Sequence, residues 1–148
     1  MKPEVDRTLE VSAIALLTRL GPALPSHYEK STAGALGALL LALREEFERG
    51  AARRVEENAA IRAIFATAHS IVEDPALAER LREASRADST DLAISALEAE
   101  NARLRGLLIE LHAHAESLDA PGANALVDEI WRELARSTVR RKLAMAMF

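Results

Sequence analysis

The stretch ALEAENARLRGLLIELHAHAESL, residues 96–118, carries the most regular pattern in the chain. A leucine recurs in it every seven residues, and Asn101 occupies a position on the same side of a helix. A seven-residue leucine repeat is typical of an α-helix that buries one apolar side. We therefore expect a long helix over about residues 90–118. The repeating residues are Leu97, Leu104, Leu111 and Leu118.

Two interpretations of this helix remain open. In a parallel homodimeric zipper the leucines face a second chain, and a single asparagine in the seam sets register and oligomeric state. In a bundle helix the same residues are core. Leu107 and Ile109 lie off the narrow seam and widen the apolar side, which favours the bundle helix. In the zipper, the interface residues are Leu97, Asn101, Leu104, Leu108, Leu111 and Leu118.

Composition narrows the class of protein. The 148 residues suffice for one domain with a core, and aromatic residues make up only 3% of them. The core must therefore consist of leucine, alanine, isoleucine and valine, and the abundant alanine and leucine favour helices. The net charge of −4 argues against nucleic-acid binding, and the absence of cysteine excludes disulfides and thiolate chemistry.

Capping signals divide the chain into helices. Ser26 and Glu29 form a capping box, which predicts a long helix over about residues 26–72, either continuous or broken at Gly50. Asp74 before a proline predicts a further helix start. We expect a single all-α domain over residues 1–148, an antiparallel bundle of five or six helices. We expect one further helix over about residues 3–20 and another that begins at about residue 122.

The longest apolar run is AGALGALLLAL, residues 33–43. It is shorter than the roughly 20 residues that span a bilayer, so we expect no membrane insertion. The run predicts a helix segment buried on several sides. Its glycines, Gly34 and Gly37, are small enough to let another helix approach closely.

Histidines and carboxylates are the only candidate metal ligands. On a helix His112 and His114 point about 200° apart, so they cannot share one ion. Pairs four residues apart can, but the Glu-x-x-His motif of di-iron bundles does not occur. We expect no metal and no cofactor. The candidates, should a metal bind, are Glu110, His112, His114, Glu116, His69 and Glu73.

Charged residues surround Gly50, from Glu45 to Glu57. They could form a docking surface or a carboxylate site. Charges spaced three and four residues apart are more typical of a solvated helix face, which is the interpretation we favour.

Two segments carry a family resemblance: RTLEVSAIALLTRLGPALPSHYEKSTAGALGALLLALREEFE, residues 7–48, and STVRRKLAMAMF, residues 137–148. In helix layout, in the Leu-Pro turn and in the late Thr-x-x-x-Lys-Leu-Ala, they resemble a family of small all-helical bacterial proteins of unknown function. Members are often encoded near aminoglycoside-phosphotransferase-like kinases and acyl-CoA dehydrogenases. The resemblance implies an accessory role beside a metabolic enzyme and supplies no catalytic residues.

We therefore expect a cytoplasmic, non-catalytic helical protein that forms a homodimer and acts through protein–protein contact, without nucleic-acid or membrane partners. The motifs of phosphate-binding loops and nucleophile elbows are absent from the sequence. The alternative is a small ligand- or metal-binding enzyme in which histidines and glutamates line an interior cavity.

Overall fold

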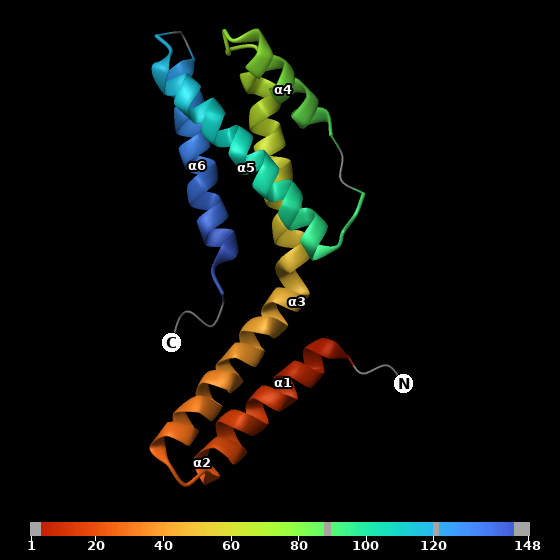
Figure 1. The fold of residues 1–148 in the computed structure, drawn as a ribbon, viewed down its shortest axis with the longest axis vertical. Helices are drawn as coiled ribbons and strands as arrows, with labels where there is room; N and C mark the ends of the chain where they lie inside the picture. The colour runs from red at the N-terminus through yellow and green to blue at the C-terminus, as the bar shows by residue number, and fades with distance from the viewer. Residues whose placement is uncertain (1–3, 88–89, 120–121, 144–148) are drawn as a thin grey trace. The chain divides into compact units, whose positions relative to one another are not determined.

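The computed structural model describes residues 4–87, 90–119 and 122–143. Helices account for nearly all of these residues, and none of them lies in a strand, which confirms the all-α prediction. The helices are drawn in Figure 1. In chain order they are α1 Val5–Ala15, the π-helical turn η1 Leu16–Leu20, α2 Gly21–Ala23, α3 His27–Ala68, α4 Pro75–Arg86, α5 Ile94–Ser117 and α6 Ala123–Arg141.

Contacts divide the chain into two compact units. Unit 1 comprises residues 1–50 and 142–148, and unit 2 comprises residues 51–141. The helix α3 contributes its first half to unit 1 and its second half to unit 2. The expectation of a single domain stays a prediction.

The first helix extends further than its sequence indicates. Proline at position 22 was expected to follow the end of the helix, but the helical path continues to Ala23 through η1 and α2. Pro22 has no N–H, and the wider π-helical turn just before it redirects the backbone hydrogen bonds, so that the Gly21 N–H donates to the Leu16 carbonyl. The predicted end at residue 20 is therefore three residues early.

The helix α3 is continuous across Gly50, which resolves the alternative between one helix and two. Its capping box is formed as predicted, because the Glu29 N–H donates to Ser26 Oγ at 3.1 Å and the Ser26 N–H donates to Glu29 Oε2 at 3.2 Å. The helix ends at Ala68, four residues before the predicted end.

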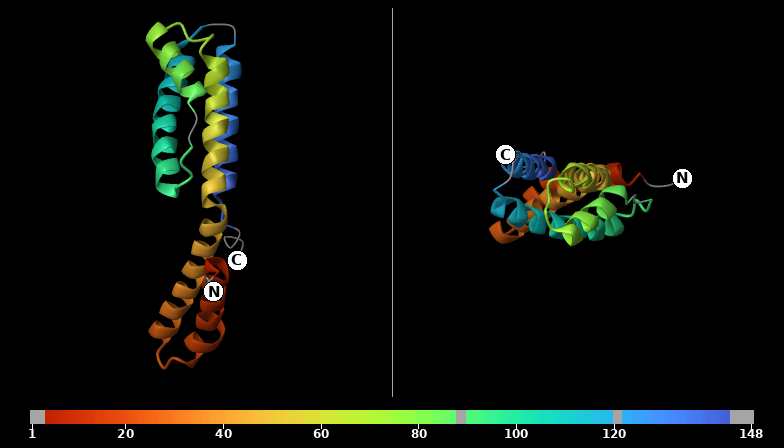
Figure 2. Two further views of the ribbon diagram at one scale, coloured as in Figure 1. Left: turned by 90° about the vertical axis from the view of Figure 1, so that its right-hand side faces the viewer. Right: turned by 90° about the horizontal axis from the view of Figure 1, so that it is seen from above.

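In unit 2, α4, α5 and α6 lie around the second half of α3 (Figures 1 and 2). The helix α4 begins where the sequence predicts, since the Asp74 carboxylate accepts from the Ala76 N–H at 2.9 Å. Phe65 on α3 is fully buried at the centre of the core. The apolar residues around it are Ile61, Ile64, Ala68, Leu77, Leu81, Leu104, Leu108, Leu111, Leu126 and Ile130.

Among the helices of the described residues, none combines the length and the apolar composition needed to cross a membrane.

Candidate interaction surface

Unit 1 is a helical hairpin held together by small residues. The buried residues along the hairpin are Ala13 on α1, Gly21 on α2, and Ala33 and Gly37 on the first half of α3. A Cβ atom at Gly37 would lie 2.6 Å from Leu17 Cγ, and one at Gly21 would lie 3.2 Å from the Cβ of Ala33. The two helices therefore approach so closely that no larger residue fits at these glycines.

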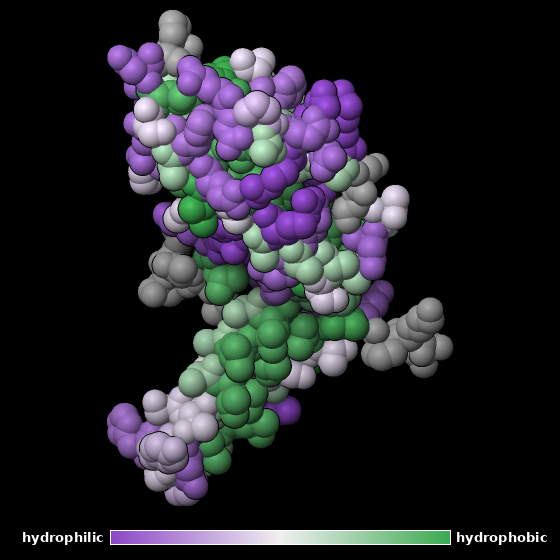
Figure 3. Space-filling view, turned by 45° about the horizontal axis from the view of Figure 1, so that its top comes forward, coloured by the Kyte–Doolittle hydropathy of each residue, from purple (hydrophilic) through white to green (hydrophobic). Residues whose placement is uncertain are grey.

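Four large apolar side chains of α3 are exposed instead. Leu36, Leu39, Leu43 and Phe47 are 49%, 54%, 47% and 54% exposed, and their spacing places them in one stripe along α3. We call these four residues the apolar stripe. Figure 3 shows apolar side chains gathered on the face of the hairpin that it displays. The expectation that residues 33–43 are buried on several sides is therefore wrong for the single chain.

The helix α1 adds to this exposed surface. Five large apolar side chains of α1 and η1, and Tyr28 at the start of α3, are between 37% and 81% exposed, with Leu20 at 50%. A monomeric protein rarely exposes a contiguous apolar patch of more than a few hundred Å², and larger patches mark interaction sites. The other exposed residues are Val5, Val11, Ile14 and Leu17.

Charge is absent from the middle of the hairpin and present at its two ends. No charged residue occurs between Ser31 and Leu43 on α3, or between Val11 and Thr18 on α1. At the open end, Arg44 Nη2 lies 3.7 Å from Glu10 Oε2 and joins the two helices. The ion pair is half-exposed, so it contributes at most about 1 kcal/mol.

The close contact at Gly37 predicts different effects for one substitution at two glycines. Gly34→Ala meets nothing within 4 Å, so it gains about 1 kcal/mol from higher helix propensity. Gly37→Ala places its Cβ against Leu17 and Ala13, at a cost of about 1–3 kcal/mol. Thermal unfolding of the two variants should therefore show Gly37→Ala to be the less stable by at least about 1 kcal/mol. Equal stability would mean that the hairpin is not closely packed.

The leucine repeat of α5 lies inside unit 2. Leu97, Leu104 and Leu111 are at most 1% exposed, and Leu108 is 4% exposed. Leu118 is half-buried, just after the helix ends. In the single chain these residues contact their own helices and offer no exposed seam. Of the two off-seam residues, Leu107 is buried as expected, whereas Ile109 is 70% exposed.

Asn101 belongs to a buried polar cluster that the sequence did not reveal. Its amide Nδ2 donates to Asn58 Oδ1 at 2.8 Å, and its Oδ1 accepts from Arg141 Nη2 at 3.0 Å. Glu57, only 2% exposed, accepts from Arg105 Nη1 at 3.0 Å and from Arg141 Nε at 3.0 Å. The polar cluster thus ties α3, α5 and α6 together at one level of unit 2.

Two buried glutamates of this region have opposite pKa shifts. Burial alone would raise the pKa of Glu57, but hydrogen bonds from Arg141 and Asn101 and the charges of Arg141 and Arg105 bring it below its ordinary value. Burial raises the pKa of Glu133 on α6, and the neighbouring Arg140 only partly opposes that. Glu57 is therefore held as a carboxylate. Because Glu57 and Arg53 are both buried, the expectation that residues 45–57 form a solvated face is wrong at these two positions.

The candidate metal ligands do not gather into one group, although two of them lie close together. His112 stacks edge-on against Trp131 of α6, and its Nε2 lies 3.5 Å from Glu116 Oε1. Glu110 pairs instead with Arg80 of α4, at 2.8 and 2.9 Å. His114 is half-buried. Within the residues that the structure describes, no group of three or more histidine, aspartate or glutamate side chains could hold a metal ion.

His69 and Glu73 lie beyond the last residue of α3, in the segment that leads to α4. They are therefore not neighbours on one helix face, as the expected helix over residues 26–72 required. His69 is half-buried and Glu73 is exposed.

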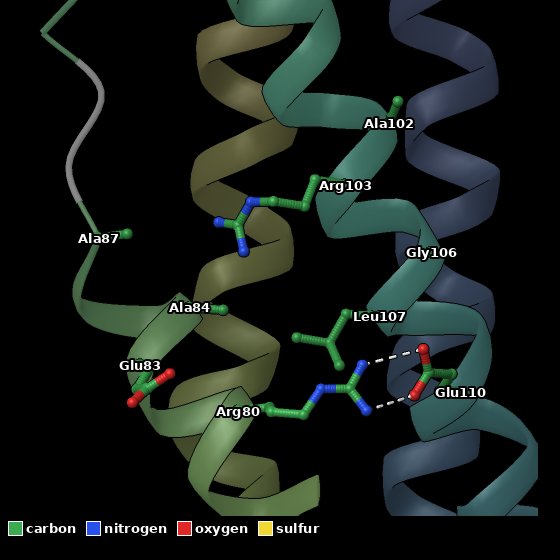
Figure 4. A pocket seen from close by; sticks show the side chains of 9 residues that line it. All are labelled: Arg80, Glu83, Ala84, Ala87, Ala102, Arg103, Gly106, Leu107 and Glu110. Atoms are coloured by element: carbon green, nitrogen blue, oxygen red, sulfur yellow. Dashed lines mark hydrogen bonds and ion pairs between the residues drawn. The ribbon is translucent and has the colours of Figure 1, made fainter.

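A surface hollow of about 500 Å³ lies between α4 and α5, where Gly106 has no side chain to fill it (Figure 4). Arg80 and Arg103 line it, but each already binds a carboxylate, Arg80 that of Glu110 and Arg103 that of Glu100. With both guanidinium groups neutralised, the hollow offers little attraction for an anion.

Comparison with known proteins identifies no relative. The chain matches no family model, no curated protein and no solved structure. The resemblance to the small bacterial helical proteins, and the accessory role that it implies, stay predictions. The exposed apolar side chains of the hairpin are accordingly the strongest guide to function.

Proposed function

We propose that this protein acts through protein–protein contact and that the hairpin of unit 1 is its docking surface. One observation carries the proposal: among the described residues of the hairpin, those that are fully buried are all alanine or glycine, whereas ten large apolar side chains are exposed. Gly37 is buried while Leu36 and Leu39, its neighbours in sequence, are about half exposed. A helix pair that must be stable alone in water has the opposite distribution, since burial of large apolar side chains is the main stabilising contribution.

The chemistry of this surface favours a protein over other ligands. A nucleic acid requires cationic side chains, and the middle of the hairpin has no charge. An apolar helix face presented at positions spaced by three and four residues is instead a common way of binding another helix. The stripe Leu36, Leu39, Leu43 and Phe47 has this spacing.

The rival proposal, a small ligand- or metal-binding enzyme, finds less support. It requires histidines and glutamates that converge on one cavity. His112 instead contacts Trp131, and Glu110 contacts Arg80. If the protein bound at the docking surface is an enzyme subunit, the chain has the accessory role beside a metabolic enzyme.

Site-specific photo-crosslinking in the native host tests the proposal. A photoreactive amino acid replaces Leu39 in the full-length chain, and in a matched control it replaces Ile109, which is also exposed and apolar but lies on α5. We expect defined protein adducts from position 39 and far fewer from position 109. An absence of protein adducts at position 39, or the same adducts from both positions, would contradict the proposal.

A further inference from the structure

We infer that the hairpin's apolar surface is covered by a second copy of this chain, with the two hairpins running in opposite directions about a two-fold axis. This inference rests on the proposed function and names its partner. The assembly would be a four-helix bundle in which each chain supplies α1 and the first half of α3.

The amount of exposed apolar surface fits such an interface. Ten large apolar side chains of the hairpin are exposed, by about half on average. A fully exposed side chain of this size carries on the order of 120 Å² of apolar surface, so the ten present roughly 600 Å². A standard homodimer interface uses about 500 Å² of apolar surface per chain. Val5, Val11 and Ile14 point in different directions around α1, so one further hairpin covers the apolar stripe and part of this surface.

The surface is also compatible with itself. A two-fold axis brings the same residues of both chains together, so any net charge near the axis would repel its copy. The apolar stripe is charge-free from Leu36 to Leu43, and its centre lies between Leu39 and Leu43. An axis through this centre lies beside Leu40 and Leu43, and the nearest charged residue, Arg44, is paired with Glu10 of its own chain.

The charges at the two ends of the hairpin favour an arrangement in which the two hairpins run in opposite directions. The turn end is cationic, because Arg19 and Lys30 outnumber Glu29. Carboxylates outnumber guanidinium groups six to three at the open end, which contains Glu4, Asp6, Glu10, Glu45, Glu46 and Glu48 against Arg7, Arg44 and Arg49. With Leu36 opposite Phe47, reversal of one hairpin moves the acidic ends of the two chains apart along α3. A parallel arrangement would bring the two acidic ends together.

Disulfide cross-linking tests both the partner and the direction, and the absence of native cysteine makes it clean. Leu36→Cys and Phe47→Cys are placed in separate full-length chains, both at half-exposed positions. In the reversed arrangement Leu36 faces Phe47 of the second copy. The two copies of Leu36 are then separated by eleven residues of helix, about 16 Å, which is too far for a disulfide.

We expect a mixture of the two variants to cross-link in up to half of the chains, the statistical limit, and each variant alone to remain unlinked. Cross-linking of each variant with itself would overturn the reversed direction. If neither the mixture nor Leu39→Cys cross-links, the second copy is excluded. If position 39 then forms photo-adducts with a different protein, the docking function still holds. If it forms no adduct, both the docking function and the second copy are excluded.

Discussion

Leu104→Glu should unfold unit 2. Leu104 is completely buried on α5, so the substitution removes a core side chain and places a carboxylate in the apolar core. The cavity and transfer terms alone cost about 2–5 kcal/mol, and burial of the charge adds several more. Far-UV circular dichroism should show a large loss of helix at room temperature.

Ile109→Glu is the matched control, since it introduces the same charge five residues further along the same helix at a position that is 70% exposed. Its stability should stay within about 0.5 kcal/mol of the wild type. A Leu104→Glu protein that remained folded, with half the wild-type molar mass, would instead mean that the leucine repeat is a seam between two chains.

Glu57→Gln should lower the thermal midpoint by more than about 10 °C. The carboxylate of Glu57 is almost fully enclosed and binds both Arg105 and Arg141, which are about 40% exposed. Removal of one partner of a buried ion pair costs about 3 kcal/mol, and each kcal/mol shifts the midpoint of a domain of this size by several degrees. Differential scanning calorimetry at neutral pH measures the shift.

The pKa shifts predict how this effect depends on pH. The pKa of Glu57 is lower in the folded chain than in the unfolded chain, so its contribution is present above the unfolded pKa of about 4 and is lost as the pH falls below it. The wild type and Glu57→Gln should therefore become equally stable in acid. The raised pKa of Glu133 has the opposite sign: its penalty appears as the pH rises above about 4.

Glu133→Gln is the control for this prediction, because it is the same substitution at another buried glutamate. It should be as stable as the wild type or more stable at neutral pH, and should differ little from it in acid. If both variants lost the same stability at neutral pH, the two carboxylates would not be distinguished by their surroundings.

Local signals were sufficient to predict most helices. The capping box at Ser26 and the cap at Asp74 depend on residues within three positions, and both are formed. The end of the first helical path, at Ala23 of α2, was misplaced because a π-helical turn keeps Pro22 within that path, which no spacing of apolar residues reveals. The break at Gly50 could not be decided, because a buried glycine inside a helix depends on its tertiary surroundings.

The polar cluster was missed for a different reason. Glu57 lies in a run of charges that has the spacing of a solvated helix, and its partner Arg141 is 84 residues away. Asn101 was singled out correctly as a polar residue in an apolar seam, but it binds Asn58 of its own chain. Pairings at this distance in sequence leave no periodic pattern.

The apolar run of the hairpin was misinterpreted because composition does not tell which side of a helix faces its neighbour. Leucines were expected inside, and Gly34 and Gly37 were expected to let another helix approach closely, which Gly37 does and Gly34 does not. Gly37 and Ala33 instead form the contact, which turns Leu36 and Leu39 outward. If the small residues Ala33 and Gly37, four positions apart, are taken as the contact side of the helix, the exposed stripe is predicted.

The molar mass in solution tests the central claim most directly. Light scattering is measured on the full-length wild type, on Leu39→Glu and on Ile109→Glu. The two variants alter exposed side chains, so both should stay folded. We expect twice the chain mass of 16.1 kDa for the wild type and Ile109→Glu, and 16.1 kDa for Leu39→Glu. A wild type of 16.1 kDa, or a Leu39→Glu variant that stays dimeric, would contradict it.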